Sequence, residues 1–231
     1  MHVLDNPVWH ALTGTHATLA EHSGPAARYD PEVAVFSAIA DDASPAAWSA
    51  LAELVGPGGT ANLARRELAI PDAWSVLFKA PCRQMWLPDA VTVDDPDDHR
   101  APGPIAELGA ADVPDMLALV ERTRPGPFVG RTVELGTYLG IRDRGELIAM
   151  TGERLHPAGF TEISAVCTDA GYRGRGLAST LVRAVVRGIR ARGETPFLHL
   201  TMENDAAHRV YKSLGFETRA ELAVTGVRAP G

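Results

Sequence analysis

The segment that most constrains the fold is the glycine- and arginine-rich turn GYRGRGLAST, residues 171–180. It follows the β-like run TEISAVCT and leads into LASTLVRAVVRGIRARG, whose apolar residues recur with helical spacing. The first N–H groups of a helix have no intrahelical partner and carry the positive end of its dipole. A strand, a glycine-rich turn and a helix in this order therefore predict an anion site at the start of the helix.

The anion could belong to more than one kind of nucleotide. The spacing Gly174-x-Gly176-x-x-Ser179 imitates a dinucleotide fingerprint whose third glycine is replaced, and Glu194 lies roughly where a ribose-binding acid would be. However, the preceding segments predict antiparallel strands rather than a leading βαβ unit, and no Gly-Lys-Ser/Thr follows as a P-loop requires. The antiparallel strands disfavour a dinucleotide site, but the glycine spacing keeps an NAD(P)-dependent oxidoreductase as an alternative.

The C-terminal part, residues 104–231, predicts the element order β-α-β-β-β-α-β-α-β. Helices are expected from Asp112, from Leu177 and from Asn204, and Gly145 supplies the turn of a hairpin. The remaining strands are expected at PIAELGAAD, TEISAVCT, TPFLHLTM and FETRAELAVT.

The N-terminal part, residues 1–98, predicts a second α/β unit without recognisable chemistry. Helices are expected over residues 8–22 and 44–55, and strands over residues 32–39, 63–70 and 74–80. The Pro- and Asp-rich stretch LPDAVTVDDPDDHRAPGP predicts a linker, which we place at residues 99–103.

Composition excludes several function classes. The 231 residues contain no signal-peptide pattern and no apolar run of the roughly 18 residues that span a bilayer, so we expect a cytoplasmic protein without a membrane partner. Residues 1–100 carry 14 Asp and Glu against 6 Lys and Arg, which makes nucleic acid an unsuitable partner. The two cysteines, Cys82 and Cys167, lack metal-ligand spacing, and neither a disulfide nor a metal site is expected.

Two motifs in the C-terminal part resemble a known family. RGRGLA, residues 173–178, and NDAAHRVYKSLGF, residues 204–216, are similar to the two signatures of the GNAT superfamily of acyl-CoA-dependent N-acetyltransferases. The segments EISAVCTDAGYRGRGLA and PFLHLTMEN resemble those of the bacterial FR-type branch allied to glycine N-acyltransferases. The resemblance covers about residues 104–222.

This resemblance implies an α/β (α+β) GNAT fold, in which a mixed, mostly antiparallel twisted sheet is flanked by helices and splays near Val166. Residues 104–231 would be the catalytic domain, and residues 1–98 a degenerate acetyltransferase-like half. Acetyl-CoA would be the acyl donor, with its pyrophosphate on the loop amides and its pantetheine arm paired with the preceding strand. The cofactor-binding residues implied in this way are Val166, Cys167, Thr168, Arg173, Gly174, Arg175, Gly176, Leu177, Ala178, Ser179, Asn204 and Ala207.

The chemistry requires a proton acceptor and a proton donor. A lysine-like amine has a pKa near 10.4 and must lose a proton before it attacks a thioester, so a base or a water relay is needed. Glu162, fourteen residues before Gly176, is the candidate base; the alternatives are an exposed edge carboxylate or one paired with Arg154. The resemblance implies Tyr211 as the acid for the departing thiolate, with core packing as its alternative, and the Val166 amide would face the oxyanion.

Several alternatives concern the route and the acceptor. Cys167 could carry the acyl group in a ping-pong route, but regular strand alternation points it away from Glu162. A module that binds acyl-CoA as a sensor, without catalysing a reaction, is the alternative function for the same glycine-rich loop. The expected partner is a small-molecule or peptide amine, for which the segment TRPGPFVGRT, residues 123–132, could form a cover. Both a monomer and a homodimer remain open.

Overall fold

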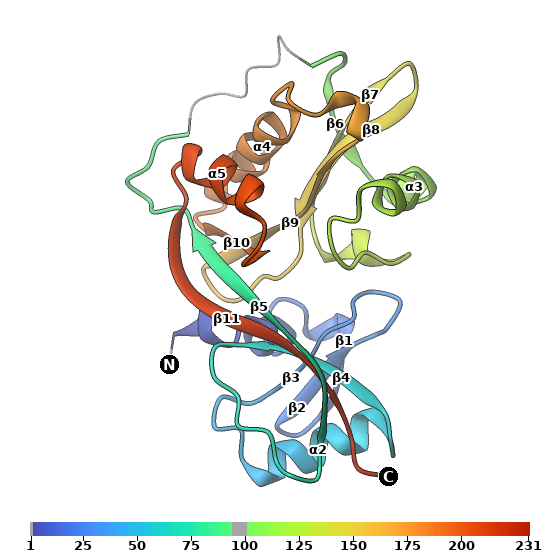
Figure 1. Cartoon of the computed structure of the whole chain (residues 1–231), viewed down its shortest axis with the longest axis vertical. Coiled ribbons are helices and arrows are strands. Elements are labelled where there is room, and N and C mark those ends of the chain that lie inside the picture. The colour runs from blue at the N-terminus through green and yellow to red at the C-terminus, as the bar shows by residue number, and fades with distance from the viewer. Residues whose placement is uncertain (1, 94–100) are drawn as a thin grey trace.

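The structure, a computed structural model, describes residues 2–93 and 101–231. Eleven strands of the described residues form one sheet in the order β1-β2-β3-β4-β11-β5-β10-β9-β8-β7-β6. Neighbouring strands are antiparallel except for β3 with β4 and β9 with β10, which are parallel. The mixed, mostly antiparallel sheet flanked by helices is therefore confirmed (Figure 1).

The C-terminal part has the predicted element order. Its hairpin turn places Arg144 and Gly145 at φ of 50° and 89°, the left-handed region that a tight two-residue turn requires. Helix α3 follows Asp112 and has Pro114 in its first turn, as predicted. The elements are β6 (Ile105–Leu108), α3 (Val113–Thr123), β7 (Tyr138–Asp143), β8 (Glu146–Glu153), β9 (Phe160–Thr168), α4 (Leu177–Ala191), β10 (Thr195–Thr201), α5 (Asp205–Ser213) and β11 (Glu217–Arg228).

The N-terminal part departs from prediction in three places. The first helix, α1 (Pro7–Leu12), ends ten residues earlier than expected, because the chain turns at Gly14 and continues into the hairpin β1 (Ala20–Ser23) and β2 (Ala26–Tyr29). Strand β3 (Ser37–Ile39) is shorter than expected, and β4 (Thr60–Arg65) begins and ends earlier. Helix α2 (Pro45–Val55) is confirmed, with the Ser44 hydroxyl accepting a hydrogen bond from the Ala47 amide at 3.3 Å.

Strand β5 (Ser75–Trp86) joins the two parts of the sequence. It contains the predicted strand at residues 74–80 but extends further and lies between β10 and β11. It pairs with β10 from Trp86 to Cys82, while β11 lies along its other edge and pairs with β4 beyond. The predicted linker lies partly in residues 94–100, outside the described residues, and the division into domains stays a prediction.

Helices cover both faces of the sheet. In the C-terminal part, α4 and α5 lie on one face and α3 on the other (Figure 1). Apolar side chains of α4 pack on β9 and β10, whereas those of α3 pack on the opposite face of β8. None of the helices in the described ranges has the length and apolarity of a membrane span.

Candidate functional site

The start of α4 is built around two glycines. Gly174 and Gly176 have φ of 76° and 82°, and Gly176 is the N-cap of α4 without any side-chain cap. Left-handed backbone is costly for residues with a Cβ atom, so glycine lets the loop form this turn. The leading amides of α4 therefore face outward without an intrahelical acceptor, as an anion site requires.

The two loop arginines have different positions. Arg173 lines the cleft beside α4, and its Nε atom donates to the Thr168 carbonyl at 3.3 Å. Arg175 instead stacks on the ring of Tyr172, 4.8 Å from the centroid, and donates to the Gly171 carbonyl at 3.2 Å. Arg175 is thus the one predicted cofactor-binding residue that does not line the cleft.

Strands β9 and β10 diverge where the sheet was expected to splay. They pair from Thr195 with Phe160 to Leu198 with Ile163, after which no further pairing connects them. A bulge on the other edge of β9 contains Ala165 at φ of 53°. The following residues, Val166, Cys167 and Thr168, line the gap between the diverging strands.

This bulge corrects the prediction for Cys167. Ser164 and Cys167 pair with Gly152 and Met150, which lie two apart on β8 and so share a face. The extra residue in the bulge therefore places Cys167 on the same face as Glu162, not on the opposite one. The thiol is buried, and burial raises its pKa.

Helix α5 forms the opposite wall of the gap. The Asn204 side chain caps it by accepting a hydrogen bond from the Ala207 amide at 3.0 Å, and both residues line the cleft. Tyr211 lies one turn further on, with its ring edge-on to Phe216 at 5.8 Å. Burial raises the pKa of the Tyr211 phenol, so its hydroxyl keeps its proton at neutral pH.

Glu162 lies beneath the surface of the cleft. Its Oε2 accepts a hydrogen bond from Arg154 Nε at 2.9 Å, and its Oε1 accepts one from Arg154 Nη2 at 2.6 Å. The same Oε1 lies 2.6 Å from Nδ1 of His199. Burial alone would raise the pKa of Glu162, but the charge of Arg154 and the hydrogen bonds from Arg154 and His199 outweigh it and lower the pKa to about 2. The carboxylate is therefore paired with Arg154, one of the two alternatives given for it, and is fully buried rather than exposed at an edge.

A hydrogen-bond chain orients His199. Arg219 can only donate, so its bond of 2.7 Å to Oε1 of Gln84 fixes the orientation of that amide. The Gln84 amide nitrogen then donates to the Leu4 carbonyl at 2.8 Å and to Nε2 of His199 at 2.9 Å. The ring proton of His199 is consequently on Nδ1, which donates to Glu162.

These features line a single cleft of about 900 Å³, within the usual range for small-molecule sites. Tyr211 and eleven of the twelve predicted cofactor-binding residues line it, whereas Glu162 does not. Sequence reasoning missed His199 and the whole wall contributed by β4, β5 and β11, because only long-range strand pairing brings these residues to the site. The segment expected to cover the acceptor contributes residues 123–127.

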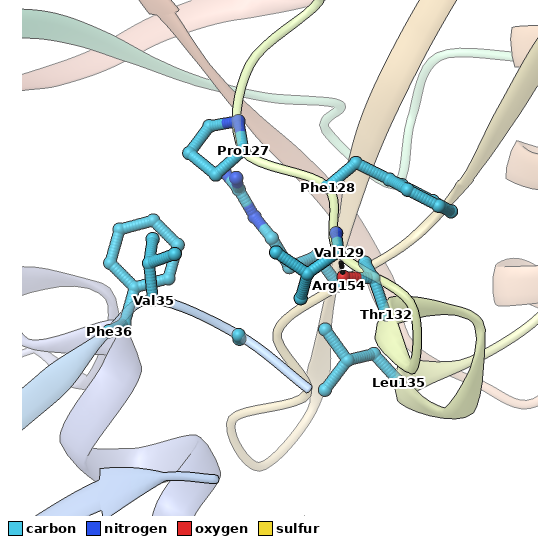
Figure 2. Close-up of a pocket in the computed structure, with 9 residues that line it drawn as sticks. Val35, Phe36, Pro127, Phe128, Val129, Thr132, Leu135 and Arg154 are labelled. Atoms are coloured by element: carbon cyan, nitrogen blue, oxygen red, sulfur yellow. Dashed lines mark hydrogen bonds between the residues drawn. The ribbon is translucent and has the colours of Figure 1, made fainter. Parts of the chain in front are cut away.

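Arg154 lies where the N-terminal part meets the segment of residues 123–132. Figure 2 shows its side chain between Val35 and Phe36 on one side and the loop carrying Pro127 on the other. The guanidinium lies 5.1 Å from the centroid of the Phe36 ring, a cation–π distance. The residues of the described ranges contain no group of three or more His, Cys, Asp or Glu side chains arranged as metal ligands.

Comparisons with known proteins identify relatives of this chain. The sequence model of the FR47-like protein family matches residues 138–224. N-alpha-acetyltransferase RimI of Mycobacterium tuberculosis is 35% identical over 83 residues, which are 35% of this chain and 51% of RimI. The chain thus matches about half the length of that curated relative.

Solved structures resemble a larger share of the chain. A crystal structure from Novosphingobium aromaticivorans, described as a "putative acetyltransferase from the GNAT family", is 40% identical, covers 100% of both chains and has a TM-score of 0.87. A GCN5-related N-acetyltransferase from Kribbella flavida is 20% identical, covers 97% of this chain and 96% of its own, and has a TM-score of 0.61. The second likeness concerns the fold alone.

Proposed function

Because the chain belongs to the GNAT family of acetyltransferases, we propose that it transfers an acetyl group from acetyl-CoA to a primary amine in one ternary complex. The observation that carries this proposal is the uncapped, glycine-rich start of α4, which opens into the cleft between β9 and β10. A helix terminus with free amides suits a diphosphate, and an unpaired strand edge suits the two amides of a pantetheine arm.

The donor would lie along residues that the sequence motifs singled out. Amides from Gly174 to Ala178 would hold the pyrophosphate, and Arg173 would add positive charge beside it. The edge of residues 166–168 that faces β10, where β9 has no strand partner, would pair with the pantetheine arm, opposite Asn204 and Ala207 on α5. The Val166 amide is the proposed donor to the developing oxyanion.

In the proposed transfer, the amine nitrogen bonds to the thioester carbonyl carbon and the carbon–sulfur bond then breaks. The electron pair of that bond leaves on the sulfur, and Tyr211 donates a hydrogen bond or its proton to the thiolate. A phenol suits hydrogen-bond donation to the thiolate, because its pKa of about 10 keeps the hydroxyl protonated at neutral pH and burial raises the Tyr211 pKa further. The side chain lines the cleft at the start of the gap between β9 and β10.

The geometry of Glu162 affects the proposed removal of the amine proton. A carboxylate with a pKa of about 2 and hydrogen bonds to both oxygens is a weak base at neutral pH. We therefore propose the water relay, in which water in the cleft passes the amine proton on to bulk solvent before the attack. Glu162 then acts as a positioning residue that holds Arg154 and His199 at the cleft wall.

Thermal stability with added ligands tests the donor site. Acetyl-CoA at about 100 times its dissociation constant should stabilise the protein by roughly 2.7 kcal/mol, which raises the midpoint by about 5–10 °C. Gly176→Glu should abolish this shift. Gly193→Glu is the matched control, because Gly193 has φ of 77°, lies in open space and follows the other end of α4.

The outcomes separate three functions. Stabilisation by acetyl-CoA that only Gly176→Glu removes, together with release of free thiol when amines are added, supports the transferase. The same stabilisation without turnover of any amine would indicate an acyl-CoA sensor. Stabilisation by NAD(P) instead would overturn the proposal in favour of an oxidoreductase.

A further inference from the structure

The cleft continues beyond the gap between β9 and β10 onto the sheet of the N-terminal part. The side chains that line it there come from three neighbouring strands, and we call them the acceptor wall. They are Asn62 and Ala64 of β4, Phe78, Ala80 and Cys82 of β5, and Leu222 and Val224 of β11. The donor loop follows β9, whereas this wall lies on the β5 side of the gap.

The strand register makes the acceptor wall one continuous surface. Val224 pairs with Ala64 on one side and with Ala80 on the other, so two alanines flank a valine in one row. Paired residues in adjacent strands share a face of the sheet. The small side chains in this row leave a shallow floor of apolar atoms.

Phe78 borders this floor in the next row. Gly226 pairs with both Asn62 and Phe78, and a Cβ atom at Gly226 would lie 2.2 Å from the Phe78 ring. The absence of a side chain at Gly226 therefore lets the aromatic ring lie across the strand. The ring is nevertheless 47% exposed, and exposed apolar groups gathered in a cleft are typical of ligand sites.

The charges around the cleft restrict the ligand further. Its charged lining consists of Arg124, Arg173 and Arg154, the last already neutralised by its ion pair with Glu162, and none of the described Asp or Glu side chains lines it. The net charge of −7 therefore does not extend into the cleft. A polyamine or aminoglycoside would lose hydration from several ammonium groups there without gaining a carboxylate partner.

From the apolar wall and the cationic lining, we propose that the acceptor is a monoamine with an aryl or alkyl body that packs on the acceptor wall. This inference rests on the proposed acetyl transfer and names the class of its acceptor. The amine end would point to the gap between β9 and β10, and the apolar body would cover Phe78, Ala80 and Val224. Loss of a single methylene contact in an apolar pocket already changes kcat/KM by about 10–200-fold.

The experiment compares two adjacent residues of β5. Phe78→Ala removes the ring of the acceptor wall, and Leu77→Ala is the matched control, because Leu77 has the same 47% exposure but does not line the cleft. The acceptors are 2-phenylethylamine and spermidine, each assayed with acetyl-CoA and with hexanoyl-CoA. Wild type and Leu77→Ala should prefer 2-phenylethylamine, whereas Phe78→Ala should lose about tenfold or more of kcat/KM, mainly through the KM of the amine.

Calorimetry of 2-phenylethylamine with the CoA-loaded protein separates this inference from the proposed function. Binding that Phe78→Ala weakens supports the acceptor wall even if no acetyl group is transferred, in which case the proposed function fails alone. Faster acetylation of spermidine than of 2-phenylethylamine would overturn the inference while the transferase stands. If Phe78→Ala changed the preference for hexanoyl-CoA over acetyl-CoA but left the amine preference unchanged, the inference would also be overturned. The wall would then bind the acyl chain of the donor.

Discussion

Acidification should destabilise this protein through a buried histidine between its two parts. His16 is 4% exposed, and its Nδ1 atom lies 2.8 Å from the hydroxyl of Tyr29. The ring of His156 lies 5.0 Å away, centroid to centroid. Burial and the neighbouring charge of His156 lower the pKa of His16 from 6.5 to about 4.

The magnitude follows from the two pKa values of His16. The unfolded chain binds a proton below pH 6.5, whereas the folded protein does so only near pH 4, so folding stability falls as the pH drops through this window. The expected loss between pH 7 and pH 5 is about 2 kcal/mol, which lowers the midpoint of thermal unfolding by about 4–8 °C. The lowered pKa of His156 adds a loss of the same sign.

The assay is chemical unfolding at pH 7 and at pH 5 for the wild type and for His16→Gln. The quantity to compare is the difference between the two pH values, because any constant cost of the substitution cancels from it. His16→Gln should lose about 2 kcal/mol less than the wild type, and His22→Gln, at an exposed histidine, should behave as the wild type. An equal pH-dependent loss in the wild type and in His16→Gln would refute the reasoning.

Three further predictions concern the cleft. Glu162→Gln should reduce the free energy of unfolding by about 3–5 kcal/mol, because it leaves the buried guanidinium of Arg154 without its charge partner; a loss below about 1 kcal/mol in urea titrations would contradict the pairing. Cys167→Ala should keep kcat within about threefold of the wild type, because a buried thiol with a raised pKa supplies little thiolate, whereas loss of turnover would indicate a ping-pong route. Tyr211→Phe should lower kcat by about 100-fold while the stabilisation by acetyl-CoA is retained; unchanged kcat would make Tyr211 a packing residue only.

Local sequence signals predicted most of the C-terminal part. The two glycines before α4 belong to one short segment, so the uncapped start of this helix could be predicted, whereas the donor site itself stays a prediction. The same signals misjudged the helix at residues 8–22, because Gly14 ends it and the chain then forms a hairpin. Local patterns also missed the one-residue bulge at Ala165, which changed the face of Cys167.

Pairing between strands that lie far apart in the sequence determined the parts of the site that no local pattern predicted. The position of Glu162 on a strand was predictable, but its surroundings depend on Arg154 from the end of β8 and on His199 from β10. The acceptor wall depends on β5 lying between β10 and β11, more than 100 residues away along the chain. No spacing within one segment encodes that arrangement.

The position of β5 also affects the order in which the protein can fold during synthesis. The two strands that flank β5 are β10 and β11, and both lie within residues 195–228. While residues 101–194 are being translated, both edges of β5 and the exposed side chains of Val76, Leu77 and Phe78 have no partner strand. Unpaired apolar edges are the usual starting points of aggregation, so the nascent chain needs protection until its last strands emerge from the ribosome.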